Sequence, residues 1–307
     1  MISLISPSEV KHPTSIAIGS FDGLHAGHRK LIESVVKEND YTPTIASFWP
    51  HPREVLYKET RLRLDLPEEK LPILEDLGIE QLVLIPFDKK LSKLSAENFI
   101  KDIVVNQLQA KSISVGANFR FGFKRSGDIN TIKLAVKDMD IKIQINSILE
   151  DKEGRISSSR VRDLLQKSDL KNATKILNRP YSFKGKVVKG KGIGKSLGFP
   201  TANLEIDGRK FLPGEGVYAA WTTINNSPNK IASVMNLGSQ PTIDPLLPSA
   251  VEVHLINKDM NLYGLTLLVE PVKKLRSQIK FQNINQLSNQ ITKDRENALK
   301  ILNKINK

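Results

Sequence analysis

The stretch Gly19-Ser20-Phe21-Asp22-Gly23-Leu24-His25-Ala26-Gly27-His28 decides how the first half of this chain folds. It follows an apolar run at residues 15–18 that predicts a buried strand, and it precedes apolar positions 31, 32, 35 and 36, whose spacing fits one face of a helix. The glycines and histidines therefore lie where a strand passes into a helix N-terminus. Such a turn offers free backbone N–H groups and the positive end of the helix dipole, which suit a phosphate. The two imidazoles add donors that are able to carry positive charge.

Predicted strands and helices alternate through the first half of the chain. The predicted strands are residues 14–18, 44–48, 81–87, 112–117 and 141–148, and the predicted helices are residues 29–37, 68–77, 96–109 and 129–137. This alternation predicts an α/β domain with a doubly wound parallel sheet, in which ligands bind at the carboxyl ends of the strands. The turn at residues 19–28 follows the first predicted strand, as that arrangement requires.

The second half has a different pattern. Two short helices are predicted at residues 158–166 and 169–177, and Asn178-Arg179-Pro180 then breaks the pattern, so we predict domains at residues 1–178 and 179–307. Short strands follow at residues 183–189, 217–224, 231–237, 251–256 and 265–272, with no helices between them, which predicts an antiparallel barrel. The chain ends in a predicted helix with one apolar stripe, formed by Leu287, Ile291, Ala298, Leu302 and Ile305.

Composition limits the class of protein. A chain of 307 residues is long enough for two cores, it contains no cysteine, and it shows neither a membrane-spanning apolar run nor a signal-peptide pattern. The net charge of +13 is uneven. Residues 1–178 hold 27 basic and 24 acidic side chains, whereas residues 179–307 hold 19 and 9. The basic second half is compatible with a nucleic-acid surface or with anionic small molecules, and charge alone does not decide between them.

Two strings in the second half could bind a nucleotide. Residues 190–195 form a glycine-rich loop with lysines, but the spacing is not that of a Walker A motif. In the following Pro200-Thr201-Ala202-Asn203, the side chains of Thr201 and Asn203 place two neutral oxygens on one side of an extended segment. Those oxygens suit a hard cation such as Mg²⁺, although a solvated turn remains the alternative.

Glu252 is the candidate general base of the second half. In Val251-Glu252-Val253-His254-Leu255, period-two alternation puts the three apolar residues on one face and Glu252 and His254 on the other. A strand carboxylate that faces a basic cavity is a reasonable general base. A solvent-facing glutamate on a half-exposed strand is the other interpretation.

Ordered motifs run along nearly the whole chain. They comprise residues 19–28, 48–56, 115–122 and 156–162 in the first half, and residues 179–181, 197–204, 213–218, 236–238, 241–242, 252–255, 262–264 and 290–291 in the second. Together they resemble the bacterial bifunctional riboflavin kinase/FMN adenylyltransferases, also called FAD synthetases. The resemblance implies a nucleotidyltransferase domain followed by a kinase barrel that carries a C-terminal helix.

The resemblance implies two reactions, and the second of them belongs to the first domain. Riboflavin is phosphorylated by ATP to FMN, and AMP from a second ATP is then transferred to FMN, giving FAD and pyrophosphate. Adenylyl transfer needs no base because the FMN phosphate is already largely ionised, so its site should be rich in donors. The residues implied to bind ATP and FMN are Gly19, Phe21, Asp22, His25, Gly27, His28, Asn118, Arg120, Phe121, Ser158, Ser159 and Arg162, with His28 and Arg162 as catalytic groups.

The resemblance also implies roles in the kinase barrel. Glu252 would be the catalytic base, Thr201 and Asn203 would hold Mg²⁺, and Gly190, Gly192 and Gly194 would cover the nucleotide phosphates. Arg276 would lie on the flavin side. The family pattern L-R-x-E-x-x-F has Gln278 in place of its acid here, so Arg276 is predicted to lack its acidic partner.

Two other functions fit parts of the sequence. One is a nucleotidyltransferase for a nicotinate or pantetheine phosphate with an inert barrel, against which the P-T-A-N string and Glu252 argue. The other is a basic RNA-binding barrel, against which the aromatic content of 6% argues, because base stacking needs aromatic rings. We therefore expect a cytoplasmic enzyme whose partners are riboflavin, FMN and ATP, with no nucleic acid and no membrane. The sequence makes no prediction of the oligomeric state.

Overall fold

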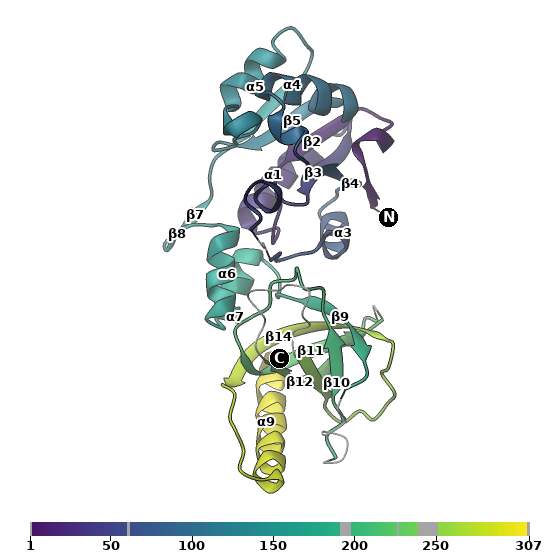
Figure 1. The fold of residues 1–307 in the computed structure, drawn as a ribbon, viewed down its shortest axis with the longest axis vertical. Helices are drawn as coiled ribbons and strands as arrows, with labels where there is room; N and C mark the ends of the chain where they lie inside the picture. Colours follow the sequence, from purple (N-terminus) through teal and green to yellow (C-terminus); the bar gives the residue numbers. More distant parts are fainter. Residues whose placement is uncertain (1, 60–61, 191–197, 226, 239–250, 306–307) are drawn as a thin grey trace. The chain divides into compact units, whose positions relative to one another are not determined.

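The computed structural model describes residues 2–59, 62–190, 198–225, 227–238 and 251–305 (Figure 1). Backbone contacts divide the chain into two compact units. The first unit comprises Met1–Arg61 and Asp65–Ser158, and the second comprises Leu62–Leu64 and Ser159–Lys307. Within the described residues, no helix is both long and apolar enough to cross a membrane.

The first unit contains a six-stranded sheet in which every pair of neighbouring strands is parallel. Its strands are β1 (Ser3–Ile5), β2 (Thr14–Ile18), β3 (Thr42–Trp49), β4 (Gln81–Pro86), β5 (Ala110–Gly116) and β6 (Lys142–Asn146), in the order β1-β4-β3-β2-β5-β6. The predicted doubly wound parallel sheet is confirmed. The short edge strand β1 was not predicted, because three residues carry too little periodicity to be recognised.

Helices cover both faces of this sheet. On one face lie α1 (Ala26–Val36) and α3 (Pro67–Asp76), and on the other lie α4 (Ala96–Asn98), the π-helix η3 (Phe99–Gln107) and α5 (Ile129–Ala135). Each face has its own hydrophobic core. Ile16 of β2 packs in the core beneath η3 and α5, and Ala17 packs in the core beneath α1 and α3, because successive strand residues point to opposite faces. The chain moves from β2 through β3 to β4, and it later returns to place β5 on the other side of β2. The carboxyl end of β2 is therefore the switch point at which such sheets bind ligands.

Shorter elements complete the first unit. They are the 3₁₀ helices η1 (Pro7–Glu9), η2 (Leu91–Lys93) and η4 (Phe123–Arg125), the helix α2 (Pro52–Tyr57), and the hairpin of β7 (Glu150–Asp151) and β8 (Gly154–Arg155). The predicted helix at residues 96–109 is confirmed in extent, but it is built from α4 and η3 rather than from one α-helix.

The main part of the second unit begins at Ser159, the second residue of the helix α6 (Ser158–Gln166). The helix α7 (Leu170–Leu177) follows, and a closed antiparallel barrel comes after it. The barrel strands are β9 (Phe183–Val188), β10 (Ala202–Glu205), β11 (Gly216–Ile224), β12 (Ile231–Leu237), β13 (Val251–Leu255) and β14 (Thr266–Arg276). Their order is β10-β13-β12-β11-β14-β9, and pairing of β9 with β10 closes the barrel. The predicted barrel is thus confirmed, with β10 as a further strand.

The C-terminal helix α9 (Ile284–Ile305) packs on β11, β12 and β14. Ala298 and Leu302 are fully buried, as the predicted stripe requires. The stripe has a gap of seven residues between Ile291 and Ala298, and the buried side chain in that gap is Asp294.

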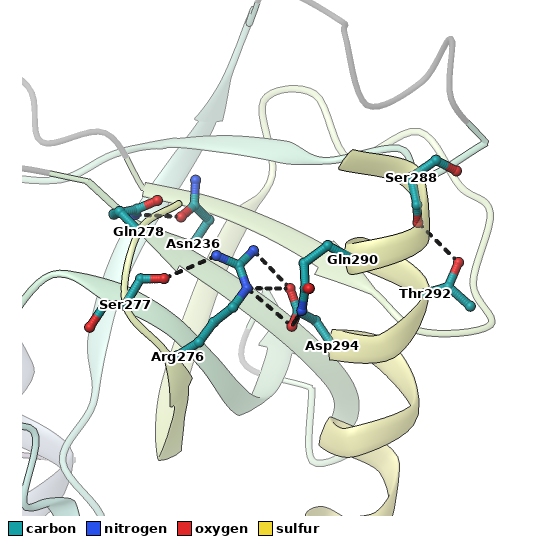
Figure 2. A network of polar contacts seen from close by, with 8 residues as sticks. All are labelled: Asn236, Arg276, Ser277, Gln278, Ser288, Gln290, Thr292 and Asp294. Atoms are coloured by element: carbon teal, nitrogen blue, oxygen red, sulfur yellow. Dashed lines mark hydrogen bonds and ion pairs between the residues drawn. The ribbon is translucent and has the colours of Figure 1, made fainter. Parts of the chain in front are cut away.

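Asp294 is the acidic partner of Arg276 (Figure 2). The guanidinium donates from Nη2 at 2.8 Å and from Nε at 2.9 Å, and Gln290 Nε2 donates to the same carboxylate at 2.9 Å. The prediction that Arg276 lacks an acidic partner is therefore wrong. The expected acid was sought two residues away in the sequence, whereas the fold supplies one from α9, eighteen residues further along.

The buried hydroxyl of Tyr218 joins the barrel to the residues that precede it. Its ring lies on β11 with no exposed surface, and its oxygen contacts Ser168 Oγ at 2.8 Å and donates to the carbonyl of Gly214. The backbone N–H of Gly214 donates in turn to the carbonyl of Leu165 on α6. These bonds attach the end of α6 to the barrel.

We expect Tyr218→Phe to lower the free energy of unfolding of the second unit by roughly 1–3 kcal/mol, because it leaves buried partners of the hydroxyl without their hydrogen bond. The measurement is urea unfolding in a Trp49→Phe background, in which Trp221 is the single tryptophan. Tyr263→Phe is the matched control, since that side chain is 67% exposed. An unchanged midpoint in Tyr218→Phe would contradict the prediction.

Candidate functional site

The turn after β2 has an unusual backbone conformation. Phe21 and Leu24 have φ of 44° and 43°, a left-handed conformation that costs energy for bulky residues, and Gly23 between them has φ of 88°. The side chains of Phe21 and Leu24 are buried in the core between the sheet and α1. Burial of these two apolar side chains holds the strained backbone in place. The turn ends at His25, which is the N-cap of α1.

His25 and His28 lie against each other at the start of α1. Their rings stack with centroids 3.7 Å apart, and the ring of Phe21 lies 5.2 Å from that of His28. A Cβ atom at Gly27 would lie 3.3 Å from the His25 ring, so a glycine at this position lets the ring pack closely against the backbone. The Nδ1 atoms of both histidines are buried and have no hydrogen-bond partner among the described residues. Two adjacent, unsatisfied imidazole nitrogens indicate a ligand site.

Burial determines the charge of this pair. Desolvation lowers the pKa of His25 from its ordinary value of 6.5 to about 4, against the opposing effect of Asp22. Desolvation also lowers the pKa of His28 well below its ordinary value, and the neighbouring His25 and Lys70 lower it further. Both imidazoles are therefore neutral at pH 7 before a ligand binds. An anion placed beside them would favour the protonated form.

Three side chains from other elements hold the turn. The carbonyl of Ser20 accepts from Ser47 Oγ on β3 and from Lys70 Nζ on α3, each at 3.2 Å. The carbonyl of Asp22 accepts from Ser158 Oγ, the first residue of α6, at 2.7 Å. Ser158 was a predicted site residue, and the structure brings it to the turn. Ser47 and Lys70 were not predicted, because neither stands in a recognised motif. The position of Lys70 among the apolar residues of a predicted helix was the one sign in the sequence that its side chain has a specific contact.

The predicted FMN-binding residues follow β5, the strand beside β2. With its amide oriented to accept, Asn118 takes a hydrogen bond from Arg155 of β8 at 2.8 Å. Arg155 was not predicted. Arg120 is exposed and pairs with Asp128 at 3.0 Å, whereas Phe121 is buried and stacks on Phe119 with centroids 5.3 Å apart. The roles of Asn118, Arg120 and Phe121 in binding FMN stay predictions.

Ser159 and Arg162 belong to the second unit. Ser159 is exposed. Arg162 donates to the carbonyl of Leu62 at 3.0 Å, and its guanidinium lies 5.8 Å from the ring centroid of Phe211. Leu62 belongs to the same unit, although it stands far from Arg162 in the sequence.

On the barrel, strand pairing aligns the predicted kinase residues. Asn203 of β10 is the register partner of Glu252 on β13, and Glu252 is in turn the partner of Asn236 on β12. Directly opposed side chains share one face of a sheet. Glu252 is half-buried, while its neighbours Val251 and Val253 are buried, as the alternation predicted. The row of three places a carboxylate between two amide side chains.

Several contacts surround this row. Gly190 approaches Asn203 so closely that a Cβ atom would lie 1.9 Å from Asn203 Nδ2. His254 Nδ1 contacts the carbonyl of Pro200 at 2.9 Å, which holds the segment that carries Thr201. Gln278 Nε2 donates to Asn236 Oδ1 at 2.7 Å (Figure 2). Gln278, which stands where the family pattern has an acid, therefore binds a side chain of the row, whereas Arg276 binds Asp294. The predicted residues Gly192 and Gly194 lie outside the described residues.

Comparisons with known proteins agree with the two units. The family model for FAD synthetase matches residues 8–160, and the model for riboflavin kinase matches residues 177–302. A bifunctional riboflavin kinase/FMN adenylyltransferase of Buchnera aphidicola subsp. Schizaphis graminum is 35% identical, and the alignment covers 97% of this chain and 96% of that protein. This chain belongs to the bifunctional riboflavin kinase/FMN adenylyltransferase family.

Further relatives extend the comparison. The riboflavin kinase/FMN adenylyltransferase of Escherichia coli (strain K12) is 34% identical, with 91% of this chain and 90% of that protein covered. A solved structure described as a macrolide-efflux protein from Streptococcus pneumoniae shares the fold, with a TM-score of 0.82, 27% identity, and 96% and 97% coverage. As a riboflavin kinase/FMN adenylyltransferase, this chain phosphorylates riboflavin to FMN and transfers AMP from ATP to FMN, giving FAD.

We expect the first unit to lose stability as the pH falls from about 6.5 toward 4. The unfolded chain binds a proton at His25 in this range and the folded chain does not, so stability is full above pH 6.5 and declines below it. For His25 the loss reaches about 3 kcal/mol near pH 4. The measurement is urea unfolding across this range in His25→Asn, which should reduce the pH dependence without abolishing it, because the lowered pKa of His28 makes a contribution of the same sign. His12→Asn, at an exposed histidine, is the control and should leave it unchanged.

Proposed function

We propose that adenylyl transfer takes place at the turn after β2, with ATP phosphates bound by His25, His28 and the N-terminus of α1. The observation that carries this proposal is the stacked imidazole pair with two buried, unsatisfied Nδ1 atoms at a sheet switch point. The eleven-residue helix α1 adds backbone N–H donors and the positive end of its dipole. Gly19, Phe21, Asp22 and Gly27 shape the turn around them.

The chemistry requires donors and no base. An oxygen of the FMN phosphate attacks the α-phosphorus of ATP, the bond to the β-phosphate oxygen breaks, and pyrophosphate leaves with the added charge. The second pKa of a phosphate ester is about 6, so the nucleophile is already ionised at neutral pH. His28 stabilises the charge that develops on the phosphates, and it does so best when the bound anion favours its protonation. The resemblance to the family assigns Arg162 a role in gripping phosphate oxygens through two N–H groups, and we keep that role as a proposal.

The FMN side of this site is assigned to the residues after β5. Asn118 and Arg120 are exposed there and can donate to the flavin phosphate, and the aromatic pair of Phe119 and Phe121 lies next to them. The contact between Asn118 and Arg155 supports this assignment, because it brings a second guanidinium to the same edge of the sheet.

Riboflavin phosphorylation is assigned to the row of side chains across β10, β13 and β12. The riboflavin hydroxyl is a weak nucleophile, so Glu252 would accept its proton as the oxygen attacks the γ-phosphorus of ATP and ADP leaves. Gly190 begins the loop proposed to cover the nucleotide phosphates, and its close approach to Asn203 supports that placement. Arg276 would act on the flavin side, held by Asp294.

Oxygen ligands in and beside this row fit Mg²⁺. Asn203 and Glu252 of the row offer amide and carboxylate oxygens, and Thr201, which directly precedes β10, offers a hydroxyl. Such oxygens are the ligands that a hard cation prefers. We propose that Thr201 and Asn203 hold the ion together with nucleotide phosphates. When bound, it would neutralise charge on the transferring phosphoryl group.

We further propose that the chain divides in function between residues 1–178 and 179–307, and that it acts in the cytoplasm, where ATP and riboflavin are supplied. The two family models, which end at residue 160 and begin at residue 177, support such a division. Small molecules are its substrates, and we expect neither nucleic acid nor membrane as a partner.

The first test is His28→Ala. We expect FAD formation from FMN and ATP to fall by about 10²–10³-fold, the usual cost of removing one donor to developing charge. FMN formation from riboflavin should remain, since His28 belongs to the other unit. Both are measured by chromatography of flavins after incubation with ATP and Mg²⁺. Equal loss of both activities in a folded variant would contradict the separation of the two sites.

The second test is Glu252→Gln, which keeps the size of the side chain but removes the proton acceptor. Single-turnover phosphorylation of riboflavin should fall by roughly 10²–10⁴-fold. Riboflavin binding, followed by flavin fluorescence, should change little, because the lost interaction belongs to the transition state. Glu205→Gln, at an exposed carboxylate on neighbouring β10, is the matched control. Phosphorylation near the wild-type rate would exclude Glu252 as the base.

A further inference from the structure

Lys70 is a buried charge beside the proposed adenylyltransferase site. It lies on α3 with only 6% of its surface exposed, and it shares a buried stripe with Pro67 and Leu74. Lysine is rarely buried to this extent, because removing an ammonium group from water is costly. An apolar side chain of similar length would complete the stripe at a lower cost. The packing of α3 therefore does not explain why a lysine stands at this position.

The contacts of Lys70 lead to the turn after β2. Its ammonium donates to the carbonyl of Ser20 at 3.2 Å, and Ser47 Oγ donates to the same carbonyl at 3.2 Å. Ser20 directly precedes Phe21, where the left-handed conformation begins. Two donors from two different elements therefore fix the orientation of the peptide at which the chain turns toward His25 and His28.

Lys70 also acts on the histidines through its charge. His28 stacks on His25, and the positive charge of Lys70 lowers the pKa of His28, in addition to the effects of burial and of His25. The other charged groups that act on the pair are Asp22 and Arg155, both through His25. Because the two imidazoles are neutral before a ligand binds, a positive charge close to them attracts a polyphosphate even in their neutral state.

We propose that Lys70 is a positioning residue of the adenylyltransferase reaction, which holds the Ser20 carbonyl and the His25–His28 pair in the arrangement that receives the ATP triphosphate. This inference rests on the proposed function of the turn. Lys70 acts through the turn and through its charge, and the donors to the phosphates remain the histidines and the N-terminus of α1.

The decisive variant is Lys70→Met, which keeps an unbranched apolar side chain in the stripe and removes the charge and the donor. We expect kcat/KM of FAD formation to fall on the order of 10²-fold, the cost of a small displacement of positioned groups. FMN formation by the same chain should stay within twofold of wild type. Lys70→Arg, which restores the charge, should recover part of the loss. Lys133→Met, at an exposed lysine on α5 on the other face of the sheet, is the control and should change neither activity.

Titration of His28 by NMR separates a positioning role from a merely structural one. The chain has five histidines, and the His28→Ala spectrum assigns the signal of the His28 ring. Without nucleotide, the pKa of His28 should be higher in Lys70→Met than in wild type, because a neighbouring positive charge has been removed. Ser47→Ala, which removes the other donor to Ser20 and no charge, should leave this titration unchanged.

FAD formation within twofold of wild type in Lys70→Met, or an unchanged His28 titration, would overturn the inference. Equal losses of both activities in Lys70→Met and in Lys70→Arg would overturn it as well, because Lys70 would then serve folding alone. The proposed site is tested independently by His28→Ala. A loss there without a loss in Lys70→Met would refute only the role of Lys70, whereas no loss there would refute the site.

Discussion

The proposed adenylyltransferase site depends on a short length of strained backbone that buried side chains hold in place. Phe21 and Leu24 adopt left-handed conformations that bulky residues avoid, and the hydrophobic burial of their side chains offsets that cost. The same turn positions His25 and His28 at the helix N-terminus with their rings stacked. In the proposed reaction, rigid support of this kind would keep these donors directed at the place where charge develops.

Burial has a second consequence, because it lowers the pKa values of both imidazoles in the chain without a ligand. At the proposed site, a phosphate bound beside them would favour their protonated forms, so positive charge would appear together with the ligand. In the barrel, the corresponding arrangement is achieved by strand pairing. The registers of β10, β13 and β12 place Asn203, Glu252 and Asn236 side by side without a strained turn.

Two helices carry a buried charge inside an apolar stripe, and in both cases the charge connects elements that are distant in the sequence. Lys70 of α3 reaches the turn after β2, and Asp294 of α9 pairs with Arg276 at the end of β14. Buried charges are tolerated when a partner satisfies them. In each helix the residue that interrupts the hydrophobic pattern is the one that makes the specific contact.

The sequence by itself determined the class of both domains, the order of most strands and helices, and the motif that leads to the histidine pair, because these follow from local periodicity and from glycine and histidine spacing. The sequence did not reveal β1 or the π-helical winding of η3. It also did not reveal the contacts of Lys70 and Ser47 with the turn after β2, or that of Arg155 with Asn118. It also predicted that Arg276 lacks an acid, whereas Asp294 supplies one. The lowered pKa values of His25 and His28 were equally beyond it. Desolvation and contacts between distant segments exist only once the chain has folded, so the tertiary structure alone decided them.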